Sequence, residues 1–127
     1  KLKETYFVNG SANHLEQVIM NLLLNSLDAI IERKEKEVDL KGEIEIGINK
    51  VSDKVYIHLK DNGMGIPQKI GNEVFDPFFT SKKVGKGTGL GLAVSFNLIK
   101  EHGGSIRFSS TEGVGTEFVI ELPCYTK

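Results

Sequence analysis

The chain has 127 residues, of which 39% are hydrophobic and 26% charged, and its formal net charge is -1. These values are typical of one soluble domain with a hydrophobic core, and the near-neutral charge does not favour general electrostatic binding to nucleic acid or to an anionic membrane. A single cysteine, Cys124, excludes an internal disulfide framework. There is no signal peptide and no apolar run long enough to cross a bilayer, and because the first residue is Lys1 we expect a piece of a longer protein.

The first third of the chain predicts a short edge strand and a long amphipathic helix. The strand is Thr5–Val8, and the helix runs from about Asn13 to Arg33, with Asn13 as its cap and Glu16 in capping-box position. Residues at helical spacing predict the buried side of this helix: Leu15, Val18, Ile19, Leu22, Leu23, Ser26, Leu27 and Ile30. The charged run over residues 32–39 predicts a solvated helix end or loop.

The remaining segments predict two hairpins, a long loop and a second helix. In chain order they are strands Glu43–Lys50 and Lys54–Lys60, the loop Asp61–Lys86, helix Leu90–His102 with a Gly103-Gly104 C-cap, and strands Ser105–Ser110 and Thr116–Leu122. This order predicts an α+β fold, a two-layer sandwich with helices on one face of a mixed, mostly antiparallel sheet.

Three polar residues of the first helix, Asn21, Asn25 and Asp28, recur on one face, which the spacing places opposite the apolar side. One interpretation is an ordinary solvent face. However, this stripe contains no Lys or Glu, and Asn is a mediocre helix former. An amide oxygen suits Mg²⁺, which also takes phosphate oxygens. The stripe therefore fits either a solvated face or a ligand site.

The stretch Asp61-Asn-Gly-Met-Gly-Ile-Pro67 places an acid at the end of an apolar strand pattern, followed by two closely spaced glycines. Acid-glycine sequences close many turns. Glycines also let backbone approach a ligand closely, so by itself the segment fits both a turn and a binding site.

Four alternating glycines in Gly85–Leu92 come just before the second helix and favour phosphate binding at its N-terminus. The segment is neither a Walker loop nor a dinucleotide fingerprint, because the motif ending and the parallel-strand setting are missing. The preceding Phe75-Asp-Pro-Phe-Phe-Thr-Ser-Lys82 carries phenylalanines that suit packing on the core. Lys82, Lys83 and Lys86 are placed either to neutralise a triphosphate or to be solvated.

Together these motifs resemble the N, G1, F and G2 boxes of the catalytic, ATP-binding domain of bacterial sensor histidine kinases. The boxes correspond to Asn21–Asp28, Asp61–Gly65, Phe75–Lys82 and Gly87–Leu92. The wider superfamily includes gyrase, Hsp90 and MutL, and it has the Bergerat-type sandwich. The resemblance covers about residues 5–123 and implies one catalytic domain over 1–127, without its dimerisation and phosphoacceptor domain.

The resemblance implies roles for individual residues. Asp61 would accept a hydrogen bond from the adenine amino group, Asn25 would coordinate Mg²⁺ with Asn21 close by, and Lys82 is the candidate for the γ-phosphate. Asn21, Asn25 and Lys82 are thus the expected catalytic residues. The expected ATP-binding residues are Asn21, Asn25, Asp28, Asp61, Gly63, Gly65, Ile66, Phe75, Thr80, Ser81, Lys82, Gly87, Thr88, Gly89, Leu90, Gly91, Leu92 and Thr116.

The residue at position 21 narrows the expected activity. ATP-hydrolysing relatives carry a glutamate base there, and Asn21 cannot accept a proton at neutral pH. The alternatives are an ATPase clamp, an anti-sigma-factor serine kinase of the same superfamily, and a degenerate binding module. His14, His58 and His102 are expected to be structural, so we expect the accepting histidine on a separate domain.

The resemblance also implies the cofactors, partners and location of the domain. ATP and Mg²⁺ are the expected cofactors. The parent's phosphoacceptor domain and a response regulator are the expected partners, with no nucleic acid and no membrane contact by this domain. We expect a cytoplasmic domain whose parent is anchored in a membrane or free.

Overall fold

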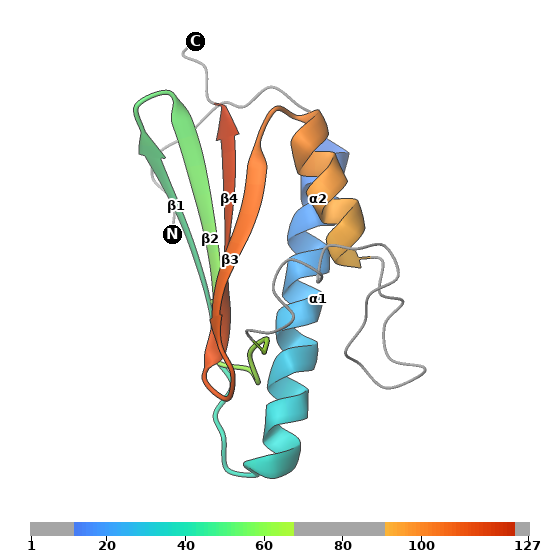
Figure 1. The fold of residues 1–127 in the computed structure, drawn as a ribbon, viewed down its shortest axis with the longest axis vertical. Helices are drawn as coiled ribbons and strands as arrows, with labels where there is room; N and C mark the ends of the chain where they lie inside the picture. The colour runs from blue at the N-terminus through green and yellow to red at the C-terminus, as the bar shows by residue number, and fades with distance from the viewer. Residues whose placement is uncertain (1–11, 68–90, 124–127) are drawn as a thin grey trace.

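The computed structural model describes residues 12–67 and 91–123, and these form two helices and four strands (Figure 1). The elements in chain order are α1 (Ala12–Lys36), β1 (Ile44–Val51), β2 (Lys54–Asp61), α2 (Gly91–Glu101), β3 (Ser105–Thr111) and β4 (Gly115–Pro123). The predicted strand Thr5–Val8 lies outside the described residues. Within the described ranges, no helix is long and apolar enough to cross a membrane.

The four strands form one antiparallel sheet in the order β1-β2-β4-β3. Both predicted hairpins are present, and Ser52 turns the first with a φ of 59°. Helices α1 and α2 lie on the same face of the sheet (Figure 1). The predicted α+β, two-layer class is therefore confirmed.

The core lies between the helices and the central strands. Along β4 every second side chain is buried, because successive residues of a strand point to opposite faces. The buried cluster comprises Val18, Leu22, Leu59, Ile99, Ile106, Phe118, Ile120 and Leu122. The same alternation places Thr116, two residues before Phe118, on the inner face of β4, where it is 5% exposed.

Helix α1 differs from its prediction in three respects. It already includes Ala12, so Asn13 lies in the first turn and does not cap it, and it extends past Arg33 to Lys36. Leu27 is 48% exposed and lies away from the core, so its assignment to the buried side was wrong. The outward surface carries Met20, Leu24, Leu27 and Ile31. At 100° per residue the polar stripe therefore lies beside the core-facing side, not opposite to it.

Helix α2 ends at the predicted glycine pair. Gly103 has a φ of 78°, its N–H donates to the Lys100 carbonyl (3.0 Å), and the Gly104 N–H donates to the Ile99 carbonyl (3.0 Å). This is the Schellman arrangement, which satisfies carbonyls left unpaired at a helix end. His102 directly follows α2, and its Nδ1 lies 2.7 Å from the carbonyl oxygen of Leu98 in the last turn of the helix.

Candidate functional site

Asp61 is the last residue of β2 and is 5% exposed, although it carries an ionisable group. Its Oδ1 accepts a hydrogen bond of 2.8 Å from the Gly63 N–H, which closes a tight turn at the end of the strand. Across the sheet its partner is Thr116 on β4. The acid is therefore held at the junction of the core and the following loop.

Burial raises the pKa of the Asp61 carboxyl above its ordinary value, and the Gly63 N–H, the Ser26 hydroxyl and the Thr116 N–H oppose this shift. Ser26 lies on the sheet-facing side of α1 and is 1% exposed. Its Oγ lies near enough to influence the carboxyl, yet it completes no hydrogen bond with any described residue. The Ser26 hydroxyl is therefore a polar neighbour of the Asp61 carboxyl in an otherwise apolar part of α1.

The glycines after Asp61 allow close contact between chain segments. A Cβ on Gly63 would lie 2.6 Å from the Cβ of Ala29 on α1, so the loop passes directly against the helix. The Met64 N–H donates to the Ala29 carbonyl (3.1 Å). Gly65 has a φ of 77° and passes against the Thr111 carbonyl, where no larger side chain fits. The loop is thus clamped between α1 and the β3–β4 hairpin.

Ser110 connects the loop to the strand opposite Asp61. Its Oγ accepts from the Ile66 N–H (2.7 Å), lies 3.0 Å from the Gly115 carbonyl oxygen and lies 2.9 Å from the Thr116 hydroxyl. A hydroxyl has one proton to donate, and the Gly115 carbonyl oxygen can only accept. If the Ser110 hydroxyl donates to this carbonyl, the Thr116 hydroxyl must donate to Ser110. The Thr116 oxygen can then still accept a hydrogen bond from another group.

Asn62 joins the same loop to the segment before β1. Its Oδ1 accepts from the Glu43 N–H (2.8 Å), and its Nδ2 donates to the Lys41 carbonyl (2.8 Å). The carbonyl of Asn62 accepts from Arg33 Nη1 (2.9 Å).

Four residues near the site, Ser26, Arg33, Asn62 and Ser110, were not among those expected from the sequence. The sequence pointed to two of these residues in part, because Ser26 lies within the Asn21–Asp28 motif and Asn62 within the Asp61–Gly65 motif.

The polar stripe on α1 lies next to this acid. Asn25 directly precedes Ser26, and Asn21 lies one turn earlier, where its Nδ2 donates to Ser95 Oγ on α2 (3.3 Å). Asn21, Asn25 and Asp28 are all partly buried. Hard neutral amide oxygens suit Mg²⁺ that keeps most of its waters. Within the described part of the chain, no group of three or more His, Cys, Asp or Glu side chains is placed to hold a metal ion.

The structure brings together only part of the expected site. Asp61, Gly63, Ile66 and Thr116 belong to one set of hydrogen-bonded or strand-paired residues, and Gly65 lies in the same loop against Thr111. Gly91 begins α2, and Leu92 follows it and packs against the core. Apart from Asn21, Asn25 and Asp28 on α1, the remaining expected residues lie outside the described residues: Phe75, Thr80, Ser81, Lys82, Gly87, Thr88, Gly89 and Leu90.

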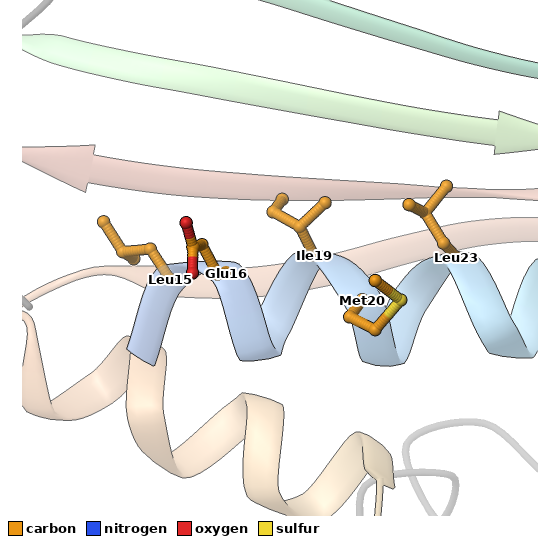
Figure 2. Close-up of a pocket in the computed structure, with 5 residues that line it drawn as sticks. All are labelled: Leu15, Glu16, Ile19, Met20 and Leu23. Carbon is orange, nitrogen blue, oxygen red and sulfur yellow. The ribbon is translucent and has the colours of Figure 1, made fainter. Parts of the chain in front are cut away.

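A separate apolar hollow lies along α1, lined by Leu15, Glu16, Ile19, Met20 and Leu23. Figure 2 shows Leu15, Ile19 and Leu23 projecting from the helix toward the strands. None of these residues is an expected site residue. The hollow is therefore distinct from the cluster around Asp61.

The site thus consists of a buried acid at the end of a strand, a glycine turn after it and a neighbouring helix that carries asparagines. Residues 10–126 match the family model described as histidine kinase-, DNA gyrase B-, and HSP90-like ATPase. The chain belongs to this family.

Known relatives of the chain are sensor kinases. It is 38% identical over 121 residues to sporulation kinase A of Bacillus subtilis, and this match covers 95% of the chain and 18% of that protein. It is 40% identical over 117 residues to the signal transduction histidine-protein kinase AtoS of Escherichia coli, covering 91% of the chain and 18% of AtoS. The chain therefore spans about a fifth of the length of these relatives.

The fold is similar to that of a solved mycobacterial sensor histidine kinase, MprB, with a TM-score of 0.79 and 25% identity. This match covers 96% of the chain and 78% of the solved one. The described domain thus corresponds to the catalytic ATP-binding domain of sensor histidine kinases.

Proposed function

We propose that this chain binds ATP with Mg²⁺ and donates the γ-phosphate to a histidine on a separate dimerisation and phosphoacceptor domain. Residues 1–127 then act as a single catalytic domain of a longer kinase. The partners are that domain of its own parent protein and a response regulator in two-component signalling. Since the reaction consumes ATP, we place the domain in the cytoplasm, with no nucleic-acid or membrane contact of its own.

The observation that carries this proposal is the geometry of Asp61. Its carboxylate is buried, has one oxygen occupied by the Gly63 N–H, and lies opposite Thr116 and close to the Ser26 hydroxyl. The adenine amino group is a hydrogen-bond donor, whereas guanine presents an acceptor oxygen at the same position. A carboxylate that accepts at this point favours adenine, because a guanine oxygen would leave two acceptors unpaired.

In this proposal, the polar stripe of α1 forms the part of the site that receives the phosphates of ATP. Asn25 would hold Mg²⁺, with Asn21 and Asp28 on the same side of the helix, and Lys82 and the glycine-rich segment 87–91 would hold the phosphates. Magnesium, when bound, neutralises phosphate charge during transfer. The protein contributes positioning, which is the main requirement of phosphoryl transfer.

The identity of residue 21, an asparagine, supports a kinase in preference to a hydrolase. Its amide nitrogen donates to Ser95 Oγ, so the side chain is oriented as a hydrogen-bond donor on this side. An amide cannot take a proton from water at neutral pH. The site is therefore suited to hold ATP until an acceptor arrives, and no observation favours the ATPase clamp or the anti-sigma-factor kinase.

The test is an equilibrium titration of Asp61→Asn with ATP and with GTP. We expect ATP affinity to fall by at least tenfold, because the amide removes the charged acceptor and can present a donor to the adenine amino group. Asp53→Asn, at the exposed β1–β2 turn, is the matched control. An unchanged ATP affinity for Asp61→Asn overturns the adenine assignment.

Transfer is tested separately with labelled ATP and Mg²⁺. We expect no efficient labelling of the chain alone, and labelling of the parent's helical phosphoacceptor domain when it is added in trans. Strong labelling of the chain by itself contradicts the proposed location of the accepting histidine. Steady phosphate release without an acceptor favours a hydrolase instead.

A further inference from the structure

Arg33 makes the most extensive set of contacts near the site that the proposed function does not use. It lies in a charged segment near the end of α1, yet its side chain is only 19% exposed. Its Nη1 donates to the carbonyls of Asn62 (2.9 Å) and Val114 (3.0 Å). Its Nε and Nη2 donate to the two carboxylate oxygens of Glu37, at 3.0 and 3.3 Å.

The two carbonyls belong to the segments that carry the site. Asn62 directly follows Asp61, and Val114 directly precedes Gly115, where β4 begins. Asp61 and Thr116 are partners across β2 and β4. The Arg33 guanidinium therefore connects the segment that follows Asp61 to the segment that precedes Thr116.

The chemistry of the side chain suits this position. Guanidinium hydrogen bonds to oxygen are charge-assisted, and the planar group directs several donors at fixed angles. A lysine ammonium is a single charged centre on a flexible stem, and it does not reproduce this fork. The pKa of the Asp61 carboxyl is shifted by its burial and by Gly63, Ser26 and Thr116, and none of these is Arg33. Arg33 thus acts on the backbone around the carboxylate.

We propose that Arg33 is a positioning residue that holds the Asp61 and Thr116 segments in the geometry that receives adenine; this rests on the function proposed above. Arg33 does not touch the nucleotide in this proposal. Its side chain fixes the spacing between two loops, and a small displacement of a hydrogen-bonding group weakens binding steeply. The role is therefore distinct from general support of the fold.

The first measurement needs no nucleotide. Amide hydrogen exchange is compared between the wild-type chain and Arg33→Gln, with Lys34→Gln as a neighbouring exposed control that removes the same charge. We expect about tenfold faster exchange at the amides of Gly63, Ile66 and Gly113, with the amide of Ile120 in the core unchanged. Equal acceleration at all four amides indicates a merely structural role and overturns the proposal.

The second measurement is ATP affinity of the same variants. We expect about tenfold weaker binding for Arg33→Gln, partial recovery for Arg33→Lys, and less than about twofold change for Lys34→Gln. Local loosening with unchanged ATP affinity overturns the positioning role while leaving ATP binding intact. If the wild-type chain itself binds no ATP, the proposed function fails, and the exchange data then report only on the structural contact.

Discussion

Asp61 and Thr116 are direct partners across β2 and β4, and each is 5% exposed although each carries polar oxygen atoms. Two residues along the same pair of strands, Leu59 faces Phe118, and both belong to the hydrophobic core. The acid is therefore positioned by the same strand register that packs the core. A one-residue slip would turn every side chain of the strand to the other face, so the register fixes the site as firmly as it fixes the fold.

We expect Asp61→Asn to change how stability depends on pH. Because burial raises the pKa of this carboxyl, the folded protein holds its proton more tightly than the unfolded chain does. Stability therefore falls as pH rises from the ordinary aspartate pKa through the raised one. The asparagine variant lacks this contribution, so its stability relative to wild type should increase across that interval. Urea unfolding of both proteins at several pH values measures the difference, and parallel profiles would contradict the prediction.

Gly63→Ala should destabilise the fold by about 1–3 kcal/mol, because the added methyl group meets the packed loop and helix. Its Cβ would lie 2.6 Å from the Cβ of Ala29 and 2.7 Å from the Ala29 carbonyl carbon. Gly47→Ala on β1 is the matched control, since nothing lies within 4 Å of the methyl group that alanine would add there. Chemical denaturation compares the two, and equal stabilities would show that the loop yields easily.

Ser110→Ala should cost about 1–3 kcal/mol, because the Ile66 N–H and the Gly115 carbonyl lose their side-chain partner together. We also expect weaker ATP binding, since the Thr116 hydroxyl loses the group that orients it. Ser109→Ala, on the exposed side of the same strand, is the control. Thermal unfolding and ATP titration of both variants provide the measurement. Indistinguishable variants would mean that water replaces the Ser110 hydroxyl without loss.

Leu22→Ala and Leu27→Ala should differ sharply, although both leucines belong to one apolar pattern. Leu22 is 0% exposed and Leu27 is 48% exposed. We expect a loss of about 2–5 kcal/mol for the first, which opens a cavity in the core. For the second we expect a change within about 0.5 kcal/mol. Urea unfolding of the two variants tests the orientation of α1, and a large loss at Leu27 would contradict it.

Most of the fold could be predicted because its elements have clear local patterns. The alternation in β2 and β4 and the glycine pair after α2 appear in the structure at the expected residues. The exposed Leu27 could not be predicted, since α1 is apolar on more of its circumference than the sheet covers. Periodicity shows which residues are apolar, whereas burial depends on which of them another layer meets.

The local motifs by themselves determined the strand-end position of Asp61, the polar stripe of α1 and the family to which the chain belongs. Only the tertiary structure decided the surroundings of that acid. Arg33 reaches carbonyls 29 and 81 residues away in the chain, and Ser110 reaches an amide 44 residues away. Such partners depend on strand register and helix packing, which local residue patterns do not encode. A charged segment expected to be solvated therefore contains a partly buried guanidinium next to the site.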